Sequence, residues 1–426
     1  MSALLIHGGT VVSGERATPG NVLIEGERIV GIGPHVSGPA GARRISARGL
    51  LVLPGLIDPH VHLREPGATQ KEDIATGTRA ALAGGFTTVL MMPNTDPPIT
   101  NGQTLSQVEA LAEAKAACDF GIFVGATGEN ARLVANVKGA IGLKLYMGSS
   151  TGDLLVDSLA VQLAHFEQYP GVIAVHAEDE EAVSHAAGRG ERRPPLCAVL
   201  AVARALALAE RSQRRLHICH VSTAQELILI RDAKARGVPV TCEVTPHHLF
   251  LTRVDEVKLG ALARMNPPLR TGADVEALWE QLETIDCLAT DHAPHTLEEK
   301  GSSKPPAGVP GLETALPLLF TALGDIPNSV CGLVRLMAEG PARTFNLVRK
   351  GHLKPGYDAD VTLVDPKASY TIGERPFFTK CGWSPFTGRA VRGRVVRVFL
   401  RGRDVYADGR IVEPEARGKR VEKCGP

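Results

Sequence analysis

Two histidines and an arginine stand two residues apart at the end of an apolar run near the start of the chain. They are His60, His62 and Arg64, in the stretch LPGLIDPHVHLREPG. If the run is a β-strand, side chains two apart share one face, so the imidazole pair and the guanidinium point the same way. Converging imidazole nitrogens are what Zn²⁺ and similar ions bind in proteins. The stretch therefore indicates a metal site with a positive side chain beside it.

Other polar residues follow later apolar runs. In chain order they are Asn94, Lys144, His176, His220, His247, His248 and Asp291. A single histidine in an apolar strand is usually a hydrogen-bonded core residue, which is how we interpret His165, His185 and His217. That interpretation does not explain why four histidines stand at the ends of such runs. Their shared placement predicts metal ligands that face one site, namely His60, His62, His176 and His220.

Lys144 is flanked by leucines in the apolar run IGLKLYM. A charged lysine in a buried strand loses its hydration, so it must be paired or neutral. One alternative is that the side chain reaches the strand end and meets a carboxylate such as Asp153. The other is that a neutral amine adds CO₂ and becomes a carbamate, whose two oxygens can bridge two metal ions. The residues alone leave both alternatives open.

Asp291 closes the run IDCLATDHAPH. An aspartate before His-Ala-Pro can simply cap a turn. Beside a metal ion, its carboxylate can instead bind the ion and accept a proton from a metal-bound water, which ionises near neutral pH. Together with the histidines, this aspartate would form a site that hydrolyses an amide-like bond.

The elements that must position these residues alternate along the chain. Eight apolar, β-branched runs occur between residue 50 and about residue 295, and helical patterns lie between them, at 71–85, 101–117, 154–169 and 222–237 among others. Apolar strands alternating with helices predict a (β/α)₈ TIM barrel over residues 53–349, with an open doubly wound sheet as the alternative. A barrel carries its functional residues at the carboxyl ends of its strands, so one mouth would receive all of these side chains.

The two ends of the chain resemble each other more than they resemble the middle. Residues 22–33 and 397–412 both show short alternating strands with glycine-containing turns, as in hairpins. Neither end supplies enough strands to be stable alone, so residues 1–52 and 350–426 are predicted to form one small β-sandwich domain. A long Gly/Pro/Ser-rich loop at 298–311 follows the last barrel strand and has the length of a lid.

Composition narrows the classes of function. Lys plus Arg number 47 and Asp plus Glu number 46, so no overall field attracts nucleic acid or an anionic membrane. No apolar run reaches the roughly 18 residues of a membrane span. The eight cysteines are scattered without a CxxC pair, which indicates buried, reduced thiols in a cytoplasmic protein.

The motifs as a set resemble the dihydroorotase family of the cyclic amidohydrolases. The resemblance covers nearly the whole chain and is specific in the order and completeness of its motifs, which are PGLIDPHVHLREPG, MMPNTDPP, KLYMGSSTG, VHAED, HICHVST, TPHHL, NPPLR, ATDHAPH, GLETALPLL and SPFTGRAVRGRVVRVFLRGRDVYADGR. It implies a hydrolase that interconverts dihydroorotate and N-carbamoyl-L-aspartate in pyrimidine biosynthesis. It also implies a small-molecule substrate and leaves open a homodimer and an association with an aspartate transcarbamoylase.

The resemblance implies a role for each matching residue. His60 and His62 would bind one metal ion with Asp291, His176 and His220 would bind a second, and carbamylated Lys144 would bridge the two. A hydroxide between the metals would attack the ring amide carbonyl, and Asp291 would pass its proton to the leaving nitrogen. Arg64, Asn94 and His295 would surround the substrate carboxylate. Asn266, with backbone groups near Ala307 and Gly308, would hold the amide edge of the ring.

Several alternatives stay open at the level of sequence. Some dihydroorotases carry an aspartate in place of the carbamylated lysine, and Asp153 is then the alternative ligand. The donor set suits Zn, and Mn or Co could substitute. Related enzymes such as dihydropyrimidinase, hydantoinase or allantoinase act on similar rings, although Arg64 argues against rings without a carboxylate. An inactive scaffold would be expected to have lost ligands that this chain retains.

Overall fold

The computed structural model describes residues 3–150, 152–324, 329–413 and 418–425; Thr151 of the KLYMGSSTG motif lies outside them. Both chain ends contribute to one sheet, which we call the composite sheet. Within the described residues it has nine strands in the order β18-β17-β16-β15-β5-β1-β2-β3, with β4 paired to β1. Their bounds are β1 Ala3–Val12, β2 Ala17–Glu25, β3 Arg28–Gly33, β4 Arg43–Ser46, β5 Leu51–Pro54, β15 Val361–Thr371, β16 Ala390–Leu400, β17 Arg403–Ala407 and β18 Arg410–Ile411.

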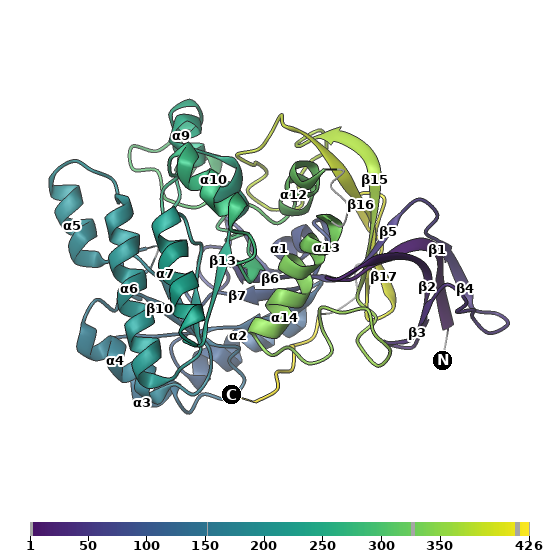
Figure 1. Ribbon diagram of the computed structural model, residues 1–426, viewed down its shortest axis with the longest axis horizontal. Helices are drawn as coiled ribbons and strands as arrows, with labels where there is room; N and C mark the ends of the chain where they lie inside the picture. Colours follow the sequence, from purple (N-terminus) through teal and green to yellow (C-terminus); the bar gives the residue numbers. More distant parts are fainter. Residues whose placement is uncertain (1–2, 151, 325–328, 414–417, 426) are drawn as a thin grey trace.

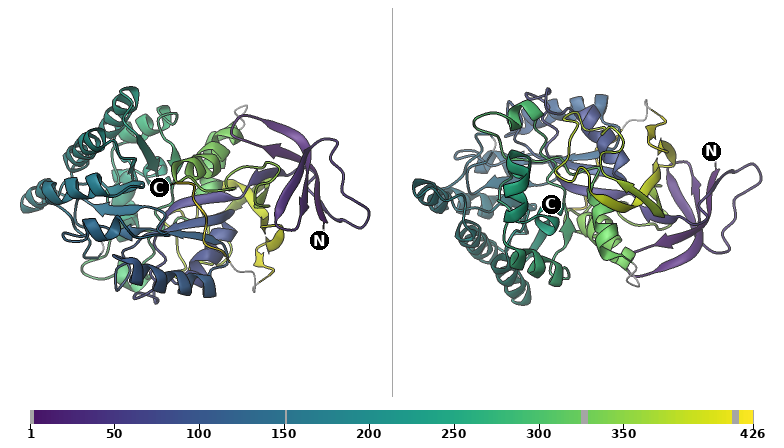
Figure 2. Two further views of the ribbon diagram at one scale, coloured as in Figure 1. Left: turned by 90° about the horizontal axis from the view of Figure 1, so that it is seen from below. Right: turned by 90° about the horizontal axis from the view of Figure 1, so that it is seen from above.

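The two ends meet at the pair β5 and β15, which run antiparallel with Val52 opposite Leu363. Figure 2 shows the purple N-terminal strands and the yellow C-terminal strands lying side by side. The hairpins predicted at 22–33 and 397–412 are present. In the second one, Arg401 and Gly402 both have positive φ angles, 46° and 77°, as the two central residues of a tight hairpin turn require. Each end therefore completes the sheet of the other.

The middle of the chain forms parallel strands. Each of the eight predicted runs contains at least one of them, with the bounds β6 Leu56–Val61, β7 Phe86–Met91, β8 Asp119–Ile122, β9 Val124–Gly125, β10 Leu143–Tyr146, β11 Ile173–His176, β12 Leu216–Ile218, β13 Val240–Val244 and β14 Cys287–Leu288. One sheet has the order β6-β7-β8 and the other β14-β13-β12-β11-β10-β9. Only Phe123 separates β8 from β9. On the other side Val61 pairs in parallel with His292, and His62 N donates to His292 O at 2.8 Å.

Helices follow the parallel strands and cover them from outside (Figure 1). The helices with their bounds are α1 Ile74–Ala83, α2 Gly102–Lys115, α3 Ala131–Val134, α4 Leu159–Gln168, α5 Glu180–Gly188, α6 Pro195–Ser212, α7 Ala224–Ala235, α8 Pro246–Phe250, α9 Arg253–Leu259, α10 Gly272–Glu280, α11 Leu297–Lys300, α12 Ala315–Leu323, α13 Ser329–Val334 and α14 Gly340–Thr344. The four helical segments predicted above contain α1, α2, α4 and α7. A capping box fixes the start of α1, α2 and α7, for example Thr223 with Glu226.

The core lies between the parallel strands and these helices. Strands β6, β7, β10 and β11 are buried along their whole length, because both of their faces are covered. A second apolar cluster, which includes Ile6, Val22, Ile24 and Phe399, fills the composite sheet. The apolar runs of the sequence therefore mark the strands that carry the predicted site residues at their ends.

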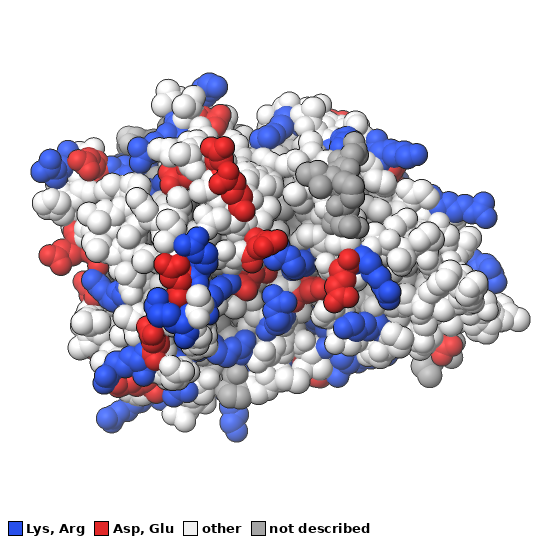
Figure 3. Space-filling model, in the orientation of Figure 1, with Lys and Arg blue, Asp and Glu red and all other residues white. Residues whose placement is uncertain are grey.

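The surface charges agree with what the sequence predicted, and the burial of the cysteines agrees only in part. None of the described helices has the length and apolarity that a membrane crossing requires. On the face in Figure 3, acidic and basic side chains are interspersed. All the cysteines are unpaired, and Cys118, Cys197, Cys219, Cys242, Cys287 and Cys331 are buried, whereas Cys424 is exposed and Cys381 is half-buried. The expectation of buried thiols thus fails for the last two, which stand outside the helix and strand core.

Candidate active site

One pocket receives most of the residues that the sequence singled out. Of the twelve residues to which the resemblance assigns a role, eleven line it, namely His60, His62, Arg64, Asn94, Lys144, His176, His220, Asn266, Asp291, Ala307 and Gly308. His247 and His248, which we expected at the same mouth, are buried but do not line the pocket. Tyr146, Ser150, Met265 and Ala293 complete the lining. The twelfth residue, His295, lies behind the wall, in contact with Arg64 and Ala307. Residues from positions 60 to 308 therefore meet at the carboxyl ends of the parallel strands.

The backbone turns sharply where three of these residues leave their strands. Arg64, His220 and Asp291 have φ angles of 59°, 39° and 46°. Non-glycine residues rarely adopt this left-handed conformation, and it costs about 1–3 kcal/mol. The turn aims each side chain into the pocket instead of along the strand. The surrounding structure thus holds strained conformations at the positions where the side chains converge.

Two imidazoles and a carboxylate converge on one point of the pocket. His60 Nε2 lies 3.3 Å and His62 Nε2 3.1 Å from the same Asp291 oxygen, Oδ1. Ligand atoms of these three buried residues all lie within 4.8 Å of one another. Two nitrogens and one carboxylate oxygen in this arrangement can hold a metal ion. The chemistry inferred from the HxH spacing is therefore matched by its geometry.

A second pair of imidazoles lies beside the first. His176 Nδ1 and His220 Nε2 are 2.9 Å apart, and the ring of His220 lies 5.5 Å from that of His60. Lys144 reaches the same place from β10. Its side chain is completely buried, and its Nζ donates to Cys219 Sγ at 2.9 Å. Of the two alternatives for Lys144, the pairing with Asp153 is not seen, because Asp153 is exposed and lies outside the pocket lining.

Two of the histidines are held from behind by hydrogen-bond acceptors, and a third lies near a carboxylate. Glu243 Oε1 lies 2.5 Å from His60 Nδ1, Asn94 Oδ1 lies 2.6 Å from His62 Nδ1, and Glu178 Oε2 lies 3.3 Å from His176 Nε2. Such contacts fix the tautomer and the ring orientation of a metal ligand. Sequence reasoning missed Glu243 and Glu178. A glutamate in the buried run PVTCEVTPHHL was the available signal for the first of them.

His217 is buried against the same carboxylate. Its Nε2 lies 3.0 Å from Glu243 Oε2, and its Nδ1 lies 2.9 Å from Thr241 Oγ1. His165 is buried with its Nε2 2.9 Å from Thr127 O. Both are hydrogen-bonded core residues, as their positions in the sequence suggested. His185, by contrast, is exposed on α5 and belongs to the surface.

The electrostatics of the site favour positive charge at His60. Burial and the neighbouring Lys144 would lower the pKa of this histidine, yet the carboxylates of Glu243 and Asp291 raise it to about 10. Burial alone would raise the pKa of Asp291, but the imidazoles of His60 and His62 hold it well below its usual range. The Asp291 carboxylate therefore stays ionised inside the protein. A cation between these groups would meet a charge environment already arranged for it.

The arginine lies in the wall of the same pocket. Arg64 is buried, its Nε donates to Pro294 O at 3.2 Å, and its Nη2 lies 3.3 Å from His295 Nε2. The same imidazole nitrogen lies 3.1 Å from Ala307 O. Gly308 has a φ of 134°, and a Cβ there would lie 2.5 Å from Ala293 O, so only glycine allows this approach. Residues 307 and 308 of the predicted lid thus form part of the wall.

Residues 51–405 match the model of the amidohydrolase family, so the chain belongs to that family. More particularly, it is 39% identical over 424 residues to the dihydroorotase of Pyrococcus horikoshii, and the match covers 99% of this chain and 96% of that protein. It is 43% identical over 404 residues to the multifunctional protein CAD of Squalus acanthias, covering 94% of this chain and 17% of that protein. The chain therefore spans about a sixth of that relative. The resemblance to dihydroorotases is confirmed.

Solved structures give the same picture of the fold. The L-hydantoinase (dihydropyrimidinase) of Arthrobacter aurescens superimposes with a TM-score of 0.93 at 29% identity, over 99% of this chain and 100% of that one. The dihydropyrimidinase of Brevibacillus agri superimposes with a TM-score of 0.88 at 28% identity. Similarity over whole chains includes the composite sheet as well as the parallel strands.

Proposed function

We propose that this chain is a dihydroorotase, which reversibly hydrolyses the ring amide of dihydroorotate to give N-carbamoyl-L-aspartate in pyrimidine biosynthesis. The observation that carries the proposal is the buried Arg64 facing the same pocket as the four histidines and Asp291. A guanidinium there matches a substrate with a carboxylate, because it forms two parallel hydrogen bonds to it. The dihydroorotases among the relatives support the same substrate.

The donor set fits a pair of divalent metal ions, for which Zn is our choice. His60, His62 and Asp291 would hold one ion, His176 and His220 the other, and Lys144 would join them as a carbamate formed with CO₂. The buried Nζ of Lys144, which has no carboxylate partner at hydrogen-bond distance among the residues that the structure describes, supports the modified form. When bound, the ions would polarise the ring carbonyl and activate a water molecule.

The chain's own residues then orient the substrate and move a proton. Arg64 and Asn94 would hold the carboxylate, with His295 supporting Arg64 from behind the wall. Asn266 with the backbone of Ala307 and Gly308 would hold the amide edge of the ring. The ionised Asp291 accepts a proton from the attacking water and passes it to the ring nitrogen as the carbon–nitrogen bond breaks. The wall formed by residues 307 and 308 shields the reacting groups from bulk water.

The fold proposal accompanies this function. We infer that the two parallel sheets form one closed (β/α)₈ barrel of residues 53–349, supported by the bridge between Val61 and His292. Residues 1–52 and 350–426 would make up a β-sandwich. An association with an aspartate transcarbamoylase and a homodimeric state are proposals that rest on the multifunctional relatives.

A second candidate is a hydantoinase or dihydropyrimidinase, since the structural neighbours carry those names. Their rings lack the carboxylate that Arg64 would bind. Turnover of dihydroorotate, dihydrouracil, hydantoin and allantoin by one purified preparation distinguishes the candidates. We expect kcat/KM to be highest for dihydroorotate, and preference for any other ring would overturn the proposal. Metal analysis of the same preparation addresses the scaffold alternative, which an empty site would favour.

A further inference from the structure

The connection between β15 and β16, residues 372–389, belongs in sequence to the composite sheet but reaches the wall of the pocket. Among the described residues of this connection there is neither helix nor strand. Figure 1 shows this connection looping past α12 between β15 and β16. Its central residues are nevertheless well buried, with Thr379 4%, Trp383 6% and Phe386 3% exposed. An irregular segment this buried must be held by specific contacts.

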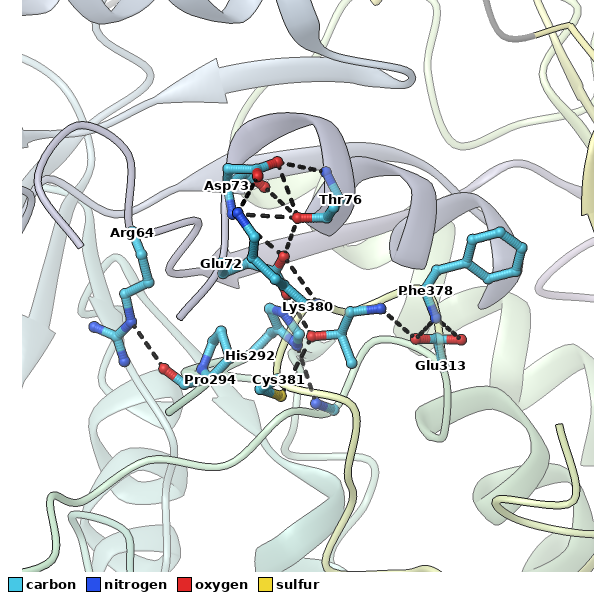
Figure 4. Close-up of polar contacts among 12 residues, drawn as sticks. Arg64, Glu72, Asp73, Thr76, His292, Pro294, Glu313, Phe378, Lys380 and Cys381 are labelled. Atoms are coloured by element: carbon cyan, nitrogen blue, oxygen red, sulfur yellow. Dashed lines mark hydrogen bonds and ion pairs between the residues drawn. The ribbon is translucent and has the colours of Figure 1, made fainter. Parts of the chain in front are cut away.

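One anchor of the connection is the buried carboxylate of Glu72, at the centre of Figure 4. Thr379 Oγ1 and Lys380 N both donate to Glu72, and Lys380 Nζ also pairs with Asp73 at 2.6 Å. On its other side, Glu72 Oε2 lies 3.3 Å from His292 Nε2. His292 directly follows Asp291. The connection is therefore linked through Glu72 to the segment that carries the catalytic aspartate.

The second anchor is Trp383. Its Nε1 donates to His295 O at 2.7 Å, and its ring packs in one apolar cluster with Met265 and Val309. Met265 precedes Asn266, and Val309 follows Gly308. Lys300 Nζ lies 5.6 Å from the Trp383 ring and donates to Arg264 O and Pro306 O, at 3.1 and 2.9 Å. Trp383 thus contacts the segments that carry His295, Asn266 and Gly308.

We propose that Trp383 is a positioning residue for substrate recognition, through which the β15–β16 connection fixes His295 and the loop of residues 298–311 against Arg64. This inference rests on the proposed function, because it takes the substrate carboxylate as the group that Arg64 binds while His295 supports it. Trp383 does not line the pocket and touches no reacting atom. It acts by holding the main chain of His295, whose imidazole lies against both Arg64 and Ala307.

The test replaces one hydrogen-bond donor and keeps an aromatic ring. Trp383→Phe removes the indole N–H that His295 O accepts. The chain offers a matched control, because Trp279 Nε1 on α10 donates to a backbone carbonyl, Leu249 O, at 2.8 Å away from the pocket. Trp279→Phe makes the same chemical change elsewhere. Steady-state kinetics on dihydroorotate and thermal melting are measured for the wild type and both variants.

We expect Trp383→Phe to raise KM about three- to tenfold with kcat within about twofold, because a weakened carboxylate site affects bound substrate and transition state alike. Trp279→Phe should leave both constants unchanged. An unchanged KM in Trp383→Phe, or an equal rise in the control, overturns the inference even if melting temperature falls. Should Trp383→Phe fail to fold, Thr379→Val removes the other anchor and carries the same prediction for KM, with an unchanged KM overturning it. Failure of the wild type to hydrolyse dihydroorotate refutes the proposed function instead.

Discussion

Buried carboxylates gather both at the mouth of the candidate site and at the junction between the parallel strands and the composite sheet. At the junction they are Asp119 on β8, with Asp358 and Asp360 just before β15. Lys350 Nζ lies among them, at 2.5, 2.9 and 2.7 Å, and Arg401 also pairs with Asp119. At the mouth, Asp291 is surrounded by imidazoles, and the pocket opens beside it.

The difference lies in what neutralises the acidic groups. At the junction the chain supplies its own cations, which fill the space between the carboxylates and join two parts of the fold. At the mouth the positive partners of Asp291 are histidines, which can give up their protons, and Arg64 contacts Pro294 O and His295 instead. By the closeness of their ligand atoms alone, both clusters could hold a metal ion. Lys350 already occupies the centre of the junction cluster, so only the cluster around Asp291 is a candidate metal site.

The largest effect should come from the mouth, with Asp291→Asn. An amide cannot take up the proton, so we expect kcat to fall by about 10²- to 10⁴-fold while the melting temperature stays nearly constant. Steady-state rates and metal content are the measurements. Asp232→Asn on the exposed face of α7 is the control and should match the wild type. A near-normal rate in Asp291→Asn would show that another group handles the proton.

A substitution at the junction should have the opposite effect, because it should lower stability without changing catalytic activity. Lys350→Met leaves three buried carboxylates without their shared partner, which should cost about 3–5 kcal/mol in the free energy of unfolding. Urea denaturation measures this. Lys234→Met is the control, since that lysine pairs with Asp286 at a partly exposed position and should cost about 1 kcal/mol or less. Equal losses in the two variants would contradict the central role given to Lys350.

The sequence predicts residues that local motifs mark, but it does not predict residues whose contacts are distant along the chain. The strand-end histidines, Lys144 and Asp291 were recognisable, because each follows an apolar run and the family motifs place them together. Lys350 and Arg401 gave no signal, since a charge between loops resembles a surface residue until the fold is known. No pattern in the sequence pointed to Trp383 either. Its partner His295 is 88 residues away, and no local spacing encodes that contact.

A smaller effect at the mouth tests recognition apart from chemistry. Arg64→Ala removes the guanidinium proposed to bind the substrate carboxylate, and kcat/KM for dihydroorotate should fall about 30- to 100-fold, mainly through KM. Arg64→Lys keeps the charge but not the paired hydrogen bonds, so it should recover only part of the loss. Kinetics on both variants decide the matter, and an unaltered profile in Arg64→Ala would remove this residue from the substrate site.

The pH dependence of stability gives the smallest and most specific contrast. Burial would raise the pKa of Asp119, but Lys350 and Arg401 hold it below 3.8, so its contribution is present above pH 3.8 and is lost as pH falls through the lowered value. Burial would lower the pKa of Lys350, but Asp119 and Asp360 raise it above 10.5, so its contribution is present below pH 10.5 and is lost as pH rises through the raised value. The stability difference between the wild type and Lys350→Met should therefore be constant at neutral pH and shrink beyond each limit. Urea denaturation across these ranges measures it. A difference that did not change with pH would mean that packing around the Lys350 stem, and not its charge, holds the two parts of the fold together.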